Sequence, residues 1–527
     1  MKGMKKRGFV LSLVCVFSFL LALPGLAGGG VKGNKVIKLS LEDALKEALR
    51  NNLDIKIERY STRAAKEGVT AAEGSFDFVT FATTGYNSSR TEPFNYFSDL
   101  KVNISQRYSF NAGIRKNLAF SGGNFQISFD DNRSSSNNPF SLYNPYHTAN
   151  LSFQLTQPLL KNFGSRIAKY NLIIARKNRE LSLAQFKNKV ISTLAQVQEL
   201  YFNLVFQMRD LEVKKGSLKL AKDQLEMTKT KVAVGSLPPI EITQAEAAVA
   251  QREVDIISAE SAVQSAKDQL LRAMKGELSP SSWEVEIIPI TEPSSEKEVP
   301  DLEECIKQAL KNRPDLIQER LNVKIKEETV YYRRNQLKPE LNLQITATLN
   351  GLNGRKPIII GNPFTREYEV IGYQEGGLGG ALRDIFTGNF RTFNVNFSLN
   401  LPLENRSAEA AYAQAEIELE QERERLRNLE QQVILEVRDA VRRVISSLKQ
   451  VEASRKAREL AEKQLKAEEE KFAVGASTNF EVLRLQEALA SAQSQEIKAI
   501  VDYNIALFNL KKVTGTLLSD LNITVKE

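Results

Sequence analysis

The chain has very few of the residues from which metal and nucleophilic sites are usually built. Its 527 residues include a single histidine, His147, and two cysteines, Cys15 and Cys305. We expect the segment that contains Cys15 to be removed, so the mature chain cannot form an internal disulfide. GxxxxGK[ST] and HExxH motifs are also missing. These absences argue against an enzyme, and the sequence predicts no cofactor and no metal site.

Blocks of charge of one sign are missing as well. The 72 Lys and Arg residues are interleaved with 64 Asp and Glu residues, for a formal net charge of +8. A nucleic-acid-binding protein would cluster its basic residues, so no nucleic-acid partner is predicted. The contents of 42% apolar and 26% charged residues also exclude a disordered chain.

Long apolar runs are confined to the N-terminus. A basic segment at 2–7 precedes an apolar stretch at 9–23, and small residues follow at Gly25 and Ala27. This pattern predicts a signal peptide over residues 1–27. No later segment approaches the length of an apolar membrane helix. An exported chain of this kind can enter a membrane only as a barrel.

The remainder of the chain is duplicated. Residues 41–55 match residues 302–316 in type along the whole stretch, and 231–235 recur as 471–475. Such a repeat predicts two copies of one structural unit. Cys305 aligns with Ala44, which indicates a packing role for that cysteine.

Each half alternates between strands and long helices. Apolar and polar residues alternate at 151–156, 341–349 and 393–401, and less regularly at 76–86. Strands of this length suit a membrane barrel with one lipid face and one polar lumen face. Taken alone, they also suit a soluble sandwich with one wet face.

The predicted helices are unusually long. Residues 165–232 and 405–472 carry heptad patterns, and each would extend for about 100 Å as a helix. Return helices at 239–274 and 478–514 are shorter. Short helices are also predicted at 41–50 and 53–74. A helix such as 53–74, added to the return helix, nearly restores the length of the long helix, so two short helices stacked end to end can flank each long one.

Strand counting then requires several chains. Four strands cannot close a barrel, because the smallest membrane barrels have eight. Three chains would supply twelve strands. The sequence therefore predicts an internally duplicated α+β membrane protein: a trimeric 12-stranded β-barrel, four strands per chain, continued by a long α-helical coiled-coil barrel.

This arrangement resembles the TolC-type outer-membrane channel family of tripartite efflux and type I secretion systems. The duplication carries the resemblance, together with the strand-to-helix junction Gln157-Pro158-Leu159-Leu160 and two helical tips. The tips contain Val234-Gly235-Ser236-Leu237 in the first half and Val474-Gly475-Ala476-Ser477, followed by Thr478 and Glu481-Val482-Leu483, in the second half.

The resemblance implies a homotrimer in the outer membrane, in contact with its lipid, with a helical tunnel through the periplasm. The tips would contact a periplasmic adaptor (membrane fusion) protein and an inner-membrane efflux or ABC transporter. The implied function is a passive exit duct. The alternative is a periplasmic coiled-coil scaffold or tether without transport activity.

Domain boundaries follow from the repeat and the resemblance. We expect a signal peptide (1–27), first-repeat helices (28–75), a strand pair with its loop (76–160), a helical hairpin (161–275), an equatorial linker (276–300), second-repeat helices (301–338), a second strand pair (339–403), a second helical hairpin (404–515) and an equatorial tail (516–527).

Three residues form the predicted periplasmic gate: Glu241, Glu481 and Arg484. In the family, two acidic residues one turn apart narrow the mouth, whereas here the matching positions hold Glu481 and Arg484. The family's tip arginine falls at Ser477, which has no charge. Glu241 and Glu481 are equally suited to capping the return helices. The predicted adaptor contacts are Val234, Gly235, Ser236, Leu237, Val474, Gly475, Ala476 and Ser477.

Two inserts interrupt the strand pairs. Residues 105–135 contain two alternating segments around Ser121-Gly122-Gly123-Asn124, which predicts an extra hairpin. Residues 350–390 form a second, glycine-rich insert. Both are expected at the end opposite the helices, facing outside, where either a lid or a simple decoration is consistent with the sequence.

Overall fold

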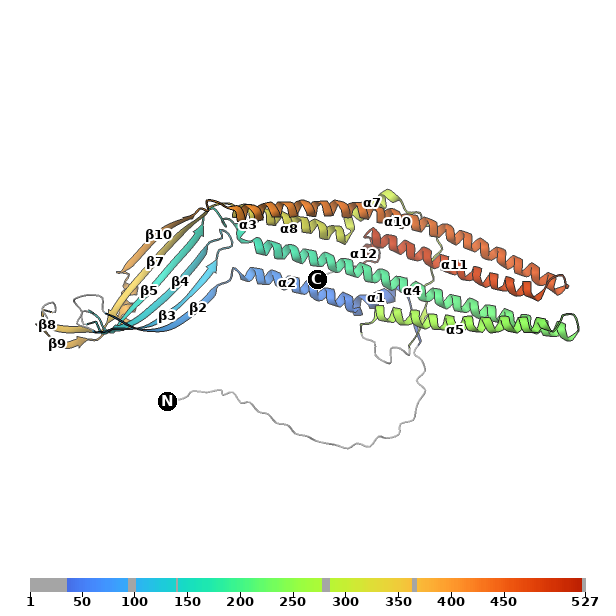
Figure 1. Ribbon diagram of the computed structural model, residues 1–527, viewed down its shortest axis with the longest axis horizontal. Coiled ribbons are helices and arrows are strands. Elements are labelled where there is room, and N and C mark those ends of the chain that lie inside the picture. Colours follow the sequence, from blue (N-terminus) through green and yellow to red (C-terminus); the bar gives the residue numbers. More distant parts are fainter. Residues whose placement is uncertain (1–35, 93–100, 139–140, 277–284, 363–366, 524–527) are drawn as a thin grey trace, which may run out of the picture.

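The computed structural model describes residues 36–92, 101–138, 141–276, 285–362 and 367–523 (Figure 1). The molecule is elongated, with a tilted β-sheet at one end and a layer of long helices that ends in two turns at the other. The predicted signal peptide lies outside the described residues.

The helices match the predicted spans closely. Two short helices begin each repeat, one or two helices form its long arm, and one returns. In the first repeat these are α1 (Leu41–Asn51), α2 (Leu53–Gly74), α3 (Ser165–Ala168), α4 (Tyr170–Ala233) and α5 (Ile240–Met274). In the second they are α7 (Leu302–Asn312), α8 (Pro314–Gln336), α10 (Arg406–Ala473) and α11 (Asn479–Val513), and α12 (Leu517–Asp520) follows. None of the helices in the described part of the chain is both long and apolar enough to cross a membrane.

Local capping explains where the repeats begin. The Ser40 side chain accepts a hydrogen bond from the Asp43 backbone N–H at the start of α1. Asp301 accepts one from Glu303 at the start of α7. Each cap satisfies a backbone donor that a helix N-terminus leaves free. The two return helices have 35 residues each, so the predicted duplication is confirmed in three dimensions.

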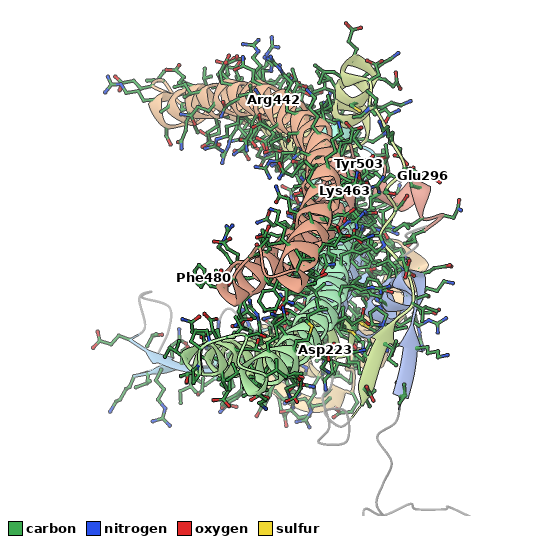
Figure 2. All side chains as sticks on the ribbon, turned by 90° about the vertical axis from the view of Figure 1, so that its right-hand side faces the viewer. Asp223, Glu296, Arg442, Lys463, Phe480 and Tyr503 are labelled. Atoms are coloured by element: carbon green, nitrogen blue, oxygen red, sulfur yellow. The ribbon has the colours of Figure 1, made fainter. Side chains whose placement is uncertain are left out.

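The helices form one curved layer. Near the sheet, α2 packs against α4, α4 against α8, and α8 against α10. Toward the tips, α5 packs against α4, α4 against α11, and α11 against α10. Viewed from the tips, the layer describes an open arc (Figure 2). Each level of the layer is therefore four helices wide.

The largest hydrophobic core lies at mid-length of the helical layer, where two short strands pack against the helices. Strands β1 (Val36–Leu39) and β6 (Glu286–Pro289) pair in parallel there. The fully buried Tyr201 Oη donates to Leu39 O at 3.0 Å and accepts from Thr291 N at 2.9 Å. Tyr503 Oη likewise donates to Glu296 O at 2.7 Å. Two buried phenols thus attach the predicted equatorial linker to the helices.

The main sheet has six strands, in the order β10-β7-β5-β4-β3-β2. They are β2 (Val79–Thr91), β3 (Asn103–Asn117), β4 (Asn124–Ser136), β5 (Tyr146–Pro158), β7 (Glu340–Gly354) and β10 (Arg391–Asn400), and all neighbours are antiparallel. The predicted architecture of a sheet continued by a helical layer is confirmed. The predicted number of four strands per chain is wrong, because the extra hairpin β3–β4 pairs on both sides within the same sheet.

The extra hairpin also lies elsewhere than predicted. Its turn is at the helical end of the sheet, not at the outer end (Figure 1). The Ser121 carbonyl accepts hydrogen bonds from Gly164 N at 3.1 Å and Gln157 Nε2 at 3.2 Å. Gly122 has φ +81°, and a Cβ there would lie 2.4 Å from Asn162 O. The turn residues were therefore identified correctly, but their position depends on a contact with residues 157–164.

The second insert does lie at the end opposite the helices. Strands β8 (Lys356–Asn362) and β9 (Glu367–Gln374) form a separate hairpin beyond the main sheet (Figure 1). The helix α9 (Leu378–Thr387) packs on β5 and β7, with Ala381 and Ile385 buried against Ala149.

The two faces of the sheet differ in polarity. A row of register partners runs Ile114, Ile127, Phe153, Ala347 and Phe393 across five strands. The adjacent row, on the opposite face, runs Gly113, Ser128, Ser152, Thr348 and Thr392. In these five strands one face is thus apolar and the other polar, which is the alternation of a membrane barrel. The edge strand β2 does not continue the two rows, because Thr80 pairs with Ile114 and Phe81 pairs with Gly113.

The buried phenols give a direct test of the mid-length core. Replacing Tyr201 with Phe leaves the Thr291 N–H without its partner, whereas the Leu39 carbonyl keeps the hydrogen bond from Ile290 N. The unpaired N–H should cost about 1–3 kcal/mol. The free energy of unfolding and the hydrogen exchange of residues 286–298 measure this effect. Tyr373→Phe, at an exposed position of the separate β8–β9 hairpin, is the control. Equal stability of the two variants would contradict the assigned role.

Candidate functional site at the helical tips

The two tips are built by the same backbone turn. Gly235 and Gly475 follow the last helical residues with φ of +77° and +80°. Ser236 N donates to Lys231 O, and Ala476 N donates to Lys471 O, each at 2.8 Å. This 6→1 bond with a left-handed glycine is the Schellman ending of a helix. The predicted turn role of both glycines is confirmed.

Most of the predicted contact residues are exposed in one chain. Val234 and Val474 are 71% and 81% exposed, and Gly235, Ser236, Gly475 and Ala476 are exposed beside them. Leu237 instead packs against the buried cluster of Leu465, Phe472, Val482 and Leu489. Leu237 therefore stabilises the tip, while the six other residues present a free surface.

Ser477 is half-buried and has an internal partner. Its Oγ donates to Glu468 Oε1 at 2.5 Å. This hydrogen bond, with the nearby Lys471 ammonium, holds the pKa of the Glu468 carboxyl below its usual range. The position that carries an arginine in the resembling family here fastens the turn to α10.

The predicted gate residues fall into two different environments. Arg484 Nη2 lies 2.7 Å from Glu481 Oε2, so these two charges largely compensate each other. The Thr478 hydroxyl accepts a hydrogen bond from Glu481 N at 3.3 Å, which confirms the predicted cap. Glu241 lies in the first turn of α5, and its Oε2 is buried without a hydrogen-bond partner among the described residues.

A buried polar network that the sequence did not reveal joins the two hairpins. Asn479 Oδ1 accepts from Gln224 Nε2 at 2.8 Å and from Thr228 Oγ1 at 3.2 Å. All three side chains are almost fully buried. Lys231 Nζ also donates to Phe472 O at 2.6 Å. The one available signal was the polar pair at 224 and 228, four residues apart inside a heptad run.

Two apolar side chains at matching repeat positions are exposed beside the gate carboxylates. Ile240 is 59% exposed, and Phe480 is 60% exposed. Phe480 projects from the tip toward the concave side of the arc (Figure 2).

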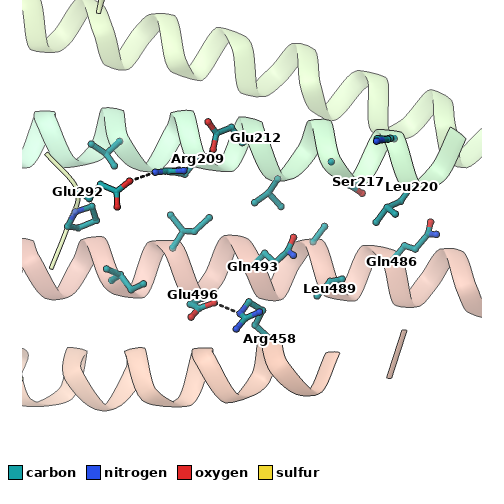
Figure 3. A pocket seen from close by; sticks show the side chains of 18 of the residues that line it. Arg209, Glu212, Ser217, Leu220, Glu292, Arg458, Gln486, Leu489, Gln493 and Glu496 are labelled. Atoms are coloured by element: carbon teal, nitrogen blue, oxygen red, sulfur yellow. Dashed lines mark hydrogen bonds and ion pairs between the residues drawn. The ribbon is translucent and has the colours of Figure 1, made fainter. Parts of the chain in front are cut away.

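A groove separates the two hairpins at mid-length. A cavity of about 820 Å³ lies between α4 and α11 (Figure 3). Arg209 pairs with Glu292 at 2.5 Å on one side, and Arg458 pairs with Glu496 at 2.6 Å on the other. Leu220, Leu489 and Ile500 supply apolar surface to the same cavity. Glu292 belongs to the linker segment whose Glu296 lies on the convex side of the arc in Figure 2.

Together, the amphipathic sheet, the long helical layer and the paired tips are the architecture of an outer-membrane channel subunit. The sequence profile of the outer membrane efflux protein family matches residues 124–276 and 305–516. The chain belongs to this family, and the predicted recognition is confirmed.

A curated relative and two solved structures agree with this assignment. The cobalt-zinc-cadmium resistance protein CzcC of Cupriavidus metallidurans is 26% identical over 220 residues. The match covers 42% of this chain and 50% of CzcC, so the chain spans about half the length of that relative.

The solved structures establish similarity of fold. The CmeC outer membrane channel of Campylobacter jejuni superposes with a TM-score of 0.65 at 14% identity, covering 90% of this chain and 86% of CmeC. The outer membrane protein VceC of Vibrio cholerae gives a TM-score of 0.63 at 14% identity, covering 90% of this chain and 96% of VceC. Membership of the outer membrane efflux protein family places the protein in the outer membrane, from which it extends into the periplasm, as predicted.

The network at Asn479 should hold the two hairpins together at the tips. Thr228→Ala and Asn479→Ala remove partners of buried groups, so each should speed hydrogen exchange in residues 220–232 and 479–490. Thr230→Ala is a matched control. Thr228 and Thr230 both donate to the carbonyl four residues earlier, but only Thr228 reaches Asn479. If Thr230→Ala has the same effect as Thr228→Ala, the inter-hairpin bond is not what orders the tips.

Proposed function

We propose that the protein is the outer-membrane exit duct of a tripartite efflux or type I secretion system. It passively conducts substrates from an inner-membrane transporter across the periplasm and the outer membrane. One observation carries this proposal. Strands with one apolar and one polar face continue directly into long helices, which extend from one end of the sheet to the tips. Such a wall encloses a water-filled path once it closes on itself.

We propose that the duct closes as a homotrimer. The edge strands β2 and β10 each have one unpaired side in the single chain. The edge helices carry exposed apolar side chains, such as Ile57 and Tyr60 on α2 and Ile417 on α10. Pairing of these edges between copies would satisfy the strand backbones and cover the apolar helix surfaces.

A periplasmic adaptor and an inner-membrane transporter are the proposed partners. The exposed tip residues around Val234 and Val474 lie at the far end from the sheet (Figure 1). The groove between α4 and α11 extends the available surface along the wall. An adaptor helix placed between the two ion pairs Arg209–Glu292 and Arg458–Glu496 would contact both hairpins at once.

The cargo is selected upstream in this proposal. The name of CzcC refers to resistance to cobalt, zinc and cadmium. In the described part of this chain, no group of three metal-ligating side chains is positioned to hold a metal ion. We therefore assign no metal-selecting role to the wall itself.

Membrane insertion distinguishes the duct from a periplasmic tether. We expect the protein to be extracted by detergent as a trimer and to form discrete channels in a planar bilayer. Native mass spectrometry and single-channel recording measure these properties. A monomer released with the soluble periplasmic fraction, without conductance, would favour the tether.

Ion selectivity tests the mouth. Because Arg484 compensates Glu481, Arg484→Ala should free three carboxylates per trimer and raise cation preference, whereas Glu241→Gln should lower it. Reversal potentials in a salt gradient measure both changes. Arg442→Ala breaks an ion pair of the same spacing, with Asp439, about 45 Å from the tip along α10, and should change selectivity little. An Arg484→Ala variant indistinguishable from Arg442→Ala would exclude residues 481 and 484 from the gate.

Docking at the tips can be tested without altering the glycine turns. Val234→Asp with Val474→Asp places charges on the exposed surface, and export should fail while the trimer persists. Val299→Asp, at an exposed position in the linker, is the control. Normal export by the tip variant would remove these residues from the partner interface.

A further inference from the structure

The inserted hairpin β3–β4 has the construction of the strands that carry helices. The apolar row continues through Ile114 on β3 and Ile127 on β4 to Phe153 on β5. The opposite face of the hairpin carries polar side chains, among them Asn111, which donates a hydrogen bond to Asp130. Toward the outer end this face becomes polar at Asp131 and His147, which contact each other at 3.1 Å, so the apolar surface is a band next to the helical end. A hairpin exposed to water on both sides would have no need for such a band.

The hairpin is also fixed at the helical end. Besides the two bonds to the Ser121 carbonyl, Asn117 Nδ2 donates to Ser75 O at 2.9 Å, next to the end of α2. The turn thus contacts both the segment that leads into β2 and the segment that follows β5. These contacts hold β3 and β4 between β2 and β5. β2 and β5 are the two strands of the first repeat that have counterparts in the second repeat.

The width of six strands agrees with the width of the helical layer. Helices pack about 9 Å apart, so the four helices α2, α4, α8 and α10 span about 36 Å. Strands lie about 4.8 Å apart, and at a tilt of about 40° each occupies about 6.3 Å of a barrel's circumference. At that tilt, six strands therefore span about 38 Å, whereas four would span only about 25 Å.

We propose that the closed wall in the membrane contains eighteen strands, six from each of three copies of the chain, with β2 of one copy paired to β10 of the next. This inference rests on the proposed trimeric duct. In this inference, each unpaired strand edge, on β2 and on β10, pairs with another copy of this chain. It also places the polar faces of β3 and β4 on the lumen.

The strand number sets the width of the exit. Eighteen strands at that spacing and tilt give a radius of about 18 Å, against about 12 Å for twelve. The barrel would then have roughly twice the cross-section of a twelve-stranded wall. It would also match the radius of the helical tunnel, so that bulky cargo meets no step between the two parts.

Cysteine labelling in membranes tests the position of the hairpin. Single cysteines replace Ile127 and Ser128 on β4, and Phe153 and Ser152 on β5 serve as matched positions on a helix-linked strand. All four variants are made in a Cys305→Ala background. Alanine is the residue at the equivalent position of the first repeat, Ala44. A water-soluble maleimide should label Ser128→Cys and Ser152→Cys about tenfold or more faster than Ile127→Cys and Phe153→Cys, because lipid excludes it from the apolar face.

The two proposals fail in different ways. If Ile127→Cys labels rapidly while Phe153→Cys stays protected, the hairpin is outside the lipid wall, and the eighteen-strand inference is overturned while the duct remains. If both apolar positions label rapidly in intact membranes, the membrane wall itself is wrong.

Cryo-electron microscopy of the unmodified trimer in nanodiscs provides a second measurement that does not depend on variants. Eighteen strands in the wall support the inference. Twelve strands in the wall, with β3–β4 displaced from it, overturn the inference.

Discussion

Unpaired backbone at the two edges of the sheet is the constraint on which the rest of the structure depends. A strand edge cannot face lipid, because the hydrocarbon region offers no water to its N–H and C=O groups. The order β10-β7-β5-β4-β3-β2 leaves one such edge on β10 and one on β2. Both belong to strands joined to the outermost helices of the layer. Closing the sheet between copies therefore closes the helical layer as well, and one requirement determines the shape of both halves.

The helical half was predictable from the sequence because its signals are local. Heptad spacing, capping residues and the two glycine turns each depend on residues close together in the chain, and α4, α5, α10 and α11 lie within a few residues of their predicted bounds. The repeat added an internal check, since each element had to occur twice. The packing role of Cys305 is consistent with this: it lies beside the core of the second repeat.

The number of strands was missed for a physical reason. The alternation over residues 105–135 predicted a hairpin correctly, but which strands it pairs with is a long-range property. That pairing depends on the contact of Ser121 with Gly164 and on the register with β2 and β5. The buried Asn479 network was missed similarly. A cap, a heptad position and a glycine turn are visible in one segment, whereas a hydrogen bond between residues 224 and 479 is not.

In the proposed duct, the open surroundings of the tip turns allow the residues that would contact a partner to change without affecting the fold. A Cβ at Gly235 or Gly475 would meet no other atom within 4 Å, and the neighbouring valines project into solvent. Exposed substitutions of this kind usually change stability by less than about 0.5 kcal/mol. Mutations at 234, 236, 474 and 476 can therefore accumulate at little cost to the fold. A chain with this tip can diverge toward a different partner during evolution while its wall stays the same.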